Sequence, residues 1–131
     1  MRQSLAQISF LVKDYDEAID FFINKLCFDL LEDVLMSPSK RWVVLAPKGN
    51  SACKLLLAKA ANEQQLSAVG NQTGGRVFLF LHTDNIERDF VEMQKKGIEF
   101  TRSIISESWG KAAVFKDLYG NLWDLVETSV S

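Results

Sequence analysis

Two residues of this chain are candidates for proton transfer, and they lie far apart in the sequence. The single histidine, His82, ends an alternating apolar stretch. Asp124 lies between Leu122 and Val126, so we expect a half-buried carboxyl group whose pKa is raised by burial. His82 and Asp124 are therefore the candidates for acid–base chemistry. A purely structural hydrogen-bonding role is the more common one for both residue types.

Other side chains are suited to holding a small molecule. Arg41 carries a guanidinium that pairs with carboxylates, although a basic residue after a turn is more often a solvated strand end. Phe78 and Phe80 alternate along one stretch, where they form either core or an aromatic wall. Trp109 lies in a polar segment with Glu107, and we expect this segment to be a loop that covers a binding site.

Composition narrows the class of protein. A chain of 131 residues with a net charge of −2 fits one globular domain and argues against a nucleic-acid or anionic-membrane partner. Cys27 and Cys53 have no metal-site spacing, so we expect two buried or half-buried thiols in a reducing compartment. No signal-peptide pattern opens the chain, and a cytoplasmic location is the expectation.

The elements that position these residues occur twice. Residues 5–12 alternate as a strand that places Ile8 and Phe10 against a helix, which Asp14 begins as N-cap in a capping box with Glu17. Strands are expected over 28–36, 41–46 and 52–58, and a short helix over 60–69.

The second copy begins about 70 residues later. Val77, Leu79 and Leu81 are expected to face a helix that begins at Asp84, with Glu87 completing its capping box and Gly97 ending it. At an offset of 70, Phe10 aligns with Phe80 and Asp14 with Asp84. Strands are expected over 98–102, 111–115 and 122–127.

Two segments give these elements a family likeness. QISFLVKDYDEAIDFFINKLCF resembles the opening of vicinal-oxygen-chelate proteins, the glyoxalase I, bleomycin-resistance and extradiol-dioxygenase superfamily. FKDLYGNLWDLVE resembles their closing F-x-D-P-x-G-N-x-x-E-L segment, with Asp124 where the family has a metal-binding Glu. The resemblance implies an α+β fold in which two βαβββ modules form a cupped mixed sheet, commonly in a homodimer. The modules are expected over about 5–59 and 76–128, joined by a linker over about 60–75, in a single domain.

The chain departs from the family pattern at the metal-binding positions. The resemblance places Gln7, and either Phe78 or Val77, where the enzymes have first-strand ligands. The fourth-strand Glu falls within residues 54–57, which carry no carboxylate. About three protein ligands are needed for a catalytic metal, so we predict no metal and no other cofactor.

We therefore predict a metal-independent protein that binds a small organic molecule in the cup of the sheet. The alternative is a glyoxalase-like lyase or isomerase that uses Asp124 and His82, or a divalent metal held by unconventional ligands such as Glu32 or Glu127. A third interpretation is an interaction module whose cup is closed by side chains. The predicted ligand-binding residues are Gln7, Ser9, Arg41, Phe78, Phe80, His82, Trp109 and Asp124.

Overall fold

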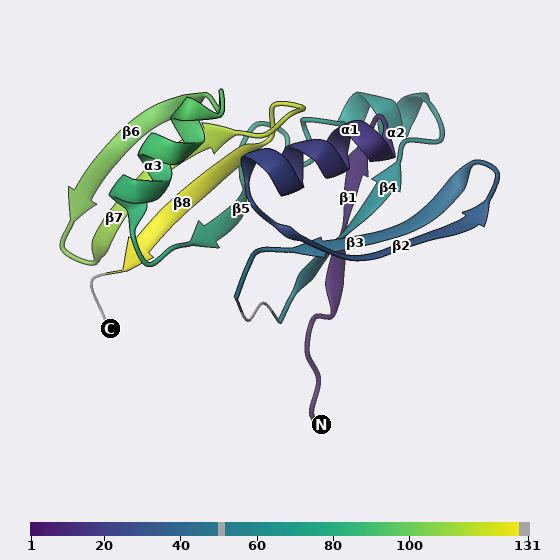
Figure 1. The fold of residues 1–131 in the computed structure, drawn as a ribbon, viewed down its shortest axis with the longest axis horizontal. Coiled ribbons are helices and arrows are strands. Elements are labelled where there is room, and N and C mark those ends of the chain that lie inside the picture. Colours follow the sequence, from purple (N-terminus) through teal and green to yellow (C-terminus); the bar gives the residue numbers. More distant parts are fainter. Residues whose placement is uncertain (50–51, 129–131) are drawn as a thin grey trace. The chain divides into compact units, whose positions relative to one another are not determined.

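The structure, a computed structural model, describes residues 1–49 and 52–128 of the chain (Figure 1). The chain divides into two compact units, Met1–Val69 and Gly70–Ser131. Each unit is a four-stranded mixed sheet with the order of a βαβββ repeat, so the predicted fold class is confirmed. No helix in the described residues is long and apolar enough to span a membrane.

The first unit is a sheet of order β1-β4-β3-β2 in which only β1 and β4 run parallel. A π-helical turn, η1, continues the first helix. The elements are β1 (Gln7–Val12), α1 (Tyr15–Asp20), η1 (Phe21–Lys25), β2 (Asp29–Ser37), β3 (Lys40–Ala46), β4 (Lys54–Lys59) and α2 (Glu63–Ala68).

The core of the first unit lies between this helix and one face of the sheet. Phe10 of β1 is fully buried and meets Phe22 edge to face, with ring centroids 5.4 Å apart. Phe28 also packs against Phe22, with ring centroids 5.4 Å apart. The prediction that the helix covers the Phe10 face is confirmed, and so is the Asp14 cap, whose side chain accepts the Glu17 amide at 2.9 Å.

The chain leaves η1 through a left-handed residue. Cys27 has a φ of +59°, a conformation in which any side chain crowds its own backbone. Both Cys27 and Cys53 are exposed, so the expectation of buried or half-buried thiols is wrong. Each cysteine lies in a connection beside a strand end, where the sheet leaves it at the surface.

The second unit repeats the plan with the order β5-β8-β7-β6. The helix α3 covers a face that includes Phe115 and Trp123, whose ring centroids are 5.6 Å apart in a stacked arrangement. The opposite orientation of Trp123 and Asp124, predicted from alternation, agrees with a Trp123 that is 2% exposed. The elements are β5 (Val77–His82), α3 (Ile86–Lys95), β6 (Phe100–Glu107), β7 (Gly110–Lys116) and β8 (Leu122–Thr128).

The turn before β8 is built on a buried carboxylate. Asp117 is 7% exposed and accepts four hydrogen bonds at 2.9–3.1 Å, from the Tyr119 amide, from the amide and side chain of Asn121, and from Trp123 Nε1. Burial raises the pKa of Asp117, and the four donors oppose that rise. The Asp117 carboxylate thus holds the turn in its conformation and links it to the buried indole of Trp123.

Two local predictions for the second unit are wrong. The N-cap of α3 is Asn85, which accepts the Arg88 amide at 3.0 Å, while Asp84 instead pairs with the Arg88 side chain. The expected loop around Trp109 is a tight turn, because β6 continues to Glu107 and β7 begins at Gly110. The cap was misplaced because Asp84 and Asn85 are neighbours that both satisfy the N-cap rule.

A register shift in β5 changes which of its residues face the helix. Val77 pairs with Leu122 and Leu79 with Trp123, so one extra residue, Phe78, is inserted between them. Val77 therefore lies on the side of Leu122, away from the helix, and the expected helix-facing position is wrong. For the same reason Phe80 is 65% exposed whereas Phe10, its partner at an offset of 70, is buried.

Candidate functional site

Each sheet has an open face, the side away from its helices. In the first sheet, strand pairing aligns one row of side chains on this face from β1 across to β2. The row consists of Ser9, Leu56, Val44 and Glu32. Lys40 and Trp42 precede Val44 at alternate positions of β3 and so share this face.

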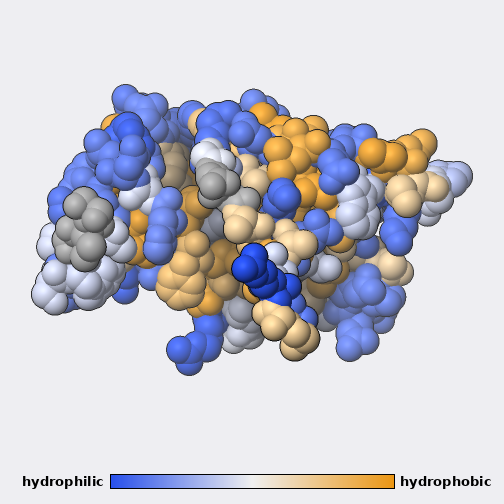
Figure 2. Space-filling view, turned by 90° about the horizontal axis from the view of Figure 1, so that it is seen from below, coloured by the Kyte–Doolittle hydropathy of each residue, from blue (hydrophilic) through white to orange (hydrophobic). Residues whose placement is uncertain are grey.

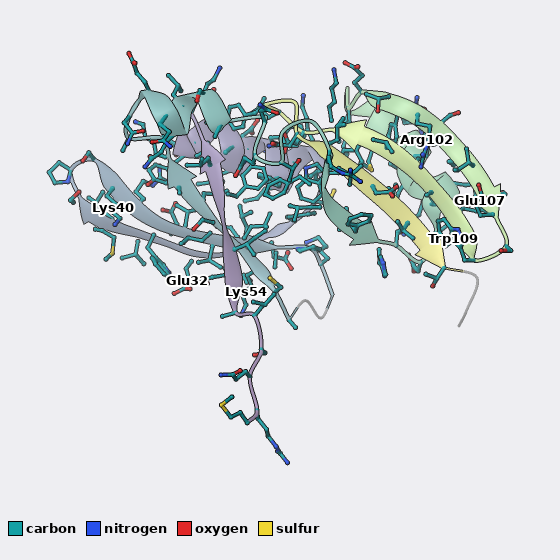
Figure 3. The ribbon with its side chains drawn as sticks, turned by 180° about the vertical axis from the view of Figure 1, so that it is seen from behind. Glu32, Lys40, Lys54, Arg102, Glu107 and Trp109 are labelled. Atoms are coloured by element: carbon teal, nitrogen blue, oxygen red, sulfur yellow. The ribbon has the colours of Figure 1, made fainter. Side chains whose placement is uncertain are left out.

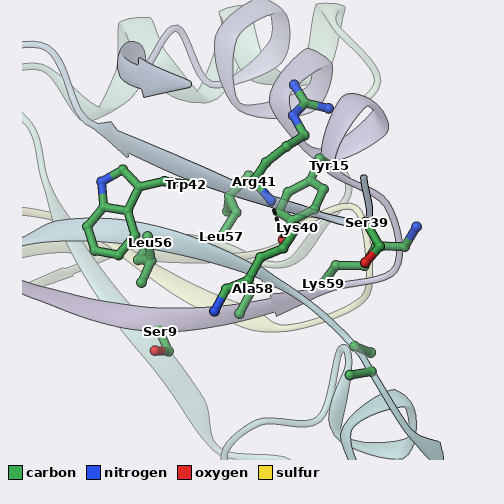
Figure 4. Close-up of a pocket in the computed structure, with 12 residues that line it drawn as sticks. Ser9, Tyr15, Ser39, Lys40, Arg41, Trp42, Leu56, Leu57, Ala58 and Lys59 are labelled. Atoms are coloured by element: carbon green, nitrogen blue, oxygen red, sulfur yellow. Dashed lines mark hydrogen bonds between the residues drawn. The ribbon is translucent and has the colours of Figure 1, made fainter. Parts of the chain in front are cut away.

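A hollow of about 670 Å³ opens on the first unit (Figure 4). Ser9, Leu56 and Ala58 form part of its lining, with Trp42 as its large apolar wall. Trp42 is held in place because its Nε1 donates to Glu32 Oε2 at 3.3 Å. An apolar hollow of this size, with a few polar groups on it, has the dimensions of a small-molecule site.

Arg41 reaches the same hollow but its guanidinium is already engaged. Its Nε and Nη2 donate to Asp33 at 3.1 and 2.7 Å, and its Nη1 donates to Asp16 at 2.8 Å. The group also lies 5.3 Å from the ring centre of Tyr15. Both carboxylates raise the pKa of Arg41, and the cluster ties α1 to the β2–β3 hairpin. In Figure 4 the guanidinium turns away from the hollow toward the helix.

The second sheet carries a corresponding row of four residues on its open face. The row consists of Phe80, Asp124, Val114 and Arg102. Asp124 Oδ1 is buried and accepts no hydrogen bond from the described residues. Arg102 Nη2 lies 3.9 Å from it, across Val114. Burial raises the pKa of Asp124, and the positive charge of Arg102 partly opposes this rise. The result is a carboxyl group with spare hydrogen-bonding capacity beside an exposed aromatic ring.

The remaining predicted residues are distributed over both units. Gln7 pairs with Lys54 at the start of β1, and His82 is exposed at the end of β5, on the Phe80 side. Phe78 is the half-buried extra residue of the β5 register shift. Trp109 is 47% exposed in the β6–β7 turn, and Figure 3 shows it on the same hairpin as Arg102.

Several residues of these two faces are not among the predicted ligand-binding residues. Trp42 and Lys40 are on the open face because β3 alternates, and the alternation with Val44 was enough to place them. Arg102 carries no such clue, since its proximity to Asp124 depends on the pairing of β6 with β7 and of β7 with β8. Glu32, Lys40 and Lys54 of the first sheet can be followed in Figure 3.

The donor atoms do not fit the metal that the family resemblance implies. In the row that contains Asp124, the other side chains are an aromatic ring, an aliphatic group and a guanidinium. Glu127 turns to the helix side, where its Oε1 accepts the Ile86 amide at 2.9 Å. Among residues 1–49 and 52–128, no three His, Cys, Asp or Glu side chains are grouped as metal ligands.

Comparisons with known proteins agree with the fold. The model of the Glyoxalase/Bleomycin resistance protein/Dioxygenase superfamily matches residues 4–125. An uncharacterized protein of Shewanella frigidimarina is 53% identical over 128 residues, covering 97% of this chain and 95% of that protein. The crystal structure of UcmS2 is similar with a TM-score of 0.84 and 25% identity, over 96% of this chain and 98% of that one. TnmS3, an antibiotic binding protein from Streptomyces sp. CB03234, has a TM-score of 0.78 and 28% identity over 98% of both chains.

Proposed function

The chain belongs to the glyoxalase/bleomycin resistance protein/dioxygenase superfamily, and from that premise we propose that it binds a small, partly aromatic molecule without a metal. The hollow beside Trp42 is the observation that carries this proposal. The indole, fixed by Glu32, offers a flat apolar surface against which a ring can stack. The antibiotic-binding description of TnmS3 supports the same class of function.

The open face of the second unit is a separate candidate ligand-binding surface. Phe80 offers an exposed ring, and Asp124 offers a hydrogen-bond acceptor without a partner among the described residues. We include Gln7, Ser9, His82 and Trp109, and leave Arg41 out because Asp16 and Asp33 occupy its donors. Sequestration of the ligand and sensing of it are both compatible with such a surface.

A binding screen with a matched pair of variants tests this proposal. Planar aromatic compounds and divalent metals are screened by thermal shift, and compounds that stabilise the protein are titrated by calorimetry. Ala58→Phe fills the hollow and should weaken binding at least about tenfold. Ala6→Phe, the same substitution at an exposed position before β1, should leave binding unchanged. Stabilisation by metals alone, or normal binding by Ala58→Phe, would contradict the proposal.

A second candidate function is proton transfer at Asp124. Its raised pKa and its vacant acceptor favour a general base, with His82 exposed on the same face. Asp124→Asn distinguishes the two functions. In an enzyme this substitution should abolish turnover of a bound compound, whereas in a binding protein it should change only the affinity for the compound. Near-stoichiometric zinc, nickel or iron that is lost on Asp124→Ala would instead support a metal enzyme.

We further infer that the protein is a homodimer. The edge strand β2 exposes apolar side chains, with Val34 50%, Leu35 70% and Met36 59% exposed. Figure 2 shows hydrophobic side chains at the surface at the end of the unit where the β2–β3 hairpin lies. Edge strands with such side chains pair readily with another copy of themselves. Light scattering should give twice the mass of 14.8 kDa, and Leu35→Glu should give a monomer.

A further inference from the structure

The hollow of the first unit has a charge opposite to that of the chain. Its lining includes three cations, Lys40, Arg41 and Lys59, and no carboxylate. The chain as a whole has 17 acidic residues against 15 basic ones. A concave, partly apolar surface lined by one sign of charge concentrates ligands of the other sign.

The three cations differ in how far they are neutralised. Arg41 forms ion pairs with Asp16 at 2.8 Å and Asp33 at 2.7 Å. In the part of the chain that the structure describes, neither Lys40 nor Lys59 has an ion pair with a carboxylate. The nearby Glu32 accepts a hydrogen bond from the Trp42 indole N–H. Two ammonium groups of the lining therefore remain available to a ligand.

Lys40 is the better placed of the two. It lies two residues before Trp42 on β3, so both side chains leave the same face of the strand. Lys59 lies one residue after Ala58, on the other side of β4. In Figure 4 the Lys40 chain extends along the hollow, while the Arg41 guanidinium points away from it. The positive charge of Lys40 thus lies on the same face of β3 as the Trp42 ring.

We propose that the hollow selects planar aromatic anions, with the ring against Trp42 and Leu56 and a carboxylate facing Lys40. The inference rests on the proposed function and adds the charge of the ligand to it. An ammonium on a flexible chain suits this role, because it can follow anions of different size. Lys40 is exposed, so water weakens the pair, and the preference for the anion should be about three- to tenfold.

Two probes that differ only in charge test the inference. Naphthalene-2-carboxylate and naphthalene-2-carboxamide have the same ring and nearly the same shape, and both are titrated into the intact protein by calorimetry. We expect the carboxylate to bind about three- to tenfold more tightly at low salt. Raising the ionic strength to 1 M should remove most of that preference, because the Debye length falls to about 3 Å.

Lys40→Gln should abolish the preference while leaving the affinity for the carboxamide unchanged. Lys25→Gln makes the same change of charge in η1, outside the hollow, and should keep the preference. Equal binding of the two probes by the wild-type protein would overturn the inference and leave the proposed function standing. Binding of neither probe, or binding unaffected by Ala58→Phe, would count against the proposed function itself.

Discussion

Replacement of Asp124 by leucine should stabilise the protein. Asp124 is the only residue among those described with a buried side-chain oxygen or nitrogen that lacks a hydrogen-bond partner. An unsatisfied buried polar group costs about 1–3 kcal/mol. The corresponding position in the row of the first sheet is Leu56, so the fold already accommodates leucine there.

The expected gain is about 1–2 kcal/mol at neutral pH. The side chain is 18% exposed and Arg102 lies 3.9 Å away, so both water and the guanidinium reduce the penalty below its upper limit. For a chain of this length the gain corresponds to a rise in Tm of about 3–6 °C. Urea denaturation followed by tryptophan fluorescence should show a higher midpoint with an unchanged m-value.

The gain should also depend on pH in a defined direction. Folding raises the pKa of Asp124 above its ordinary 3.8, so the native state favours the protonated carboxyl. The wild-type protein therefore loses stability as pH rises through the folded pKa, and the leucine variant has no such loss. The advantage of Asp124→Leu should be greatest near pH 7 and should shrink as the pH is lowered toward 3.8.

Asp117 provides the matched control. Burial raises its pKa as well, but four donors satisfy it. Asp117→Ala leaves those donors unpaired and should cost at least about 3 kcal/mol. A variant Asp124→Leu that is less stable than the wild type, with the m-value unchanged, would refute this reasoning. The long Arg102 contact would then be worth more than the burial penalty.

Two further pairs of substitutions test particular local conformations. Cys27→Gly should raise the free energy of unfolding by about 0.5–1 kcal/mol, because the φ of +59° strains any side chain. Cys27→Val should lower the free energy of unfolding. Equal stability of the two variants would contradict the strain. Asn85→Ala should lower the free energy of unfolding by about 1 kcal/mol, because α3 loses its N-cap. Asp84→Ala should change the free energy of unfolding by less than about 0.5 kcal/mol. Chemical denaturation measures both, and the reverse order would show that Asp84 is the N-cap.

Features that depend on a few consecutive residues could be predicted from the sequence. The Asp14 cap, the helix end at Gly97 and the alternation of β8 all follow from local rules that have one solution in this chain. The N-cap of α3 was missed because Asp84 and Asn85 satisfy the same rule, and the structure favours Asn85. Local chemistry alone does not separate two adjacent good caps.

Features that depend on strand pairing could not be predicted in this way. The run Val77–His82 is apolar up to its last residue, so the sequence contains nothing that marks Phe78 as the extra residue. The proximity of Arg102 to Asp124 requires the registers of two strand pairs. The hollow beside Trp42 likewise needs side chains from β1, β3 and β4, which only the folded sheet brings together.

The extra residue in β5 has a consequence for how a duplicated module diverges. One inserted residue exchanges the outward and inward side chains of the strand beyond it, while the helix α3 still follows the strand. For this reason Phe80 lies at the surface, at the position that Ser9 has in the first unit. A single insertion at a strand edge can therefore replace a whole set of ligand-facing groups at once. Such a step is open to natural selection and to protein engineers, and it leaves the rest of the scaffold untouched.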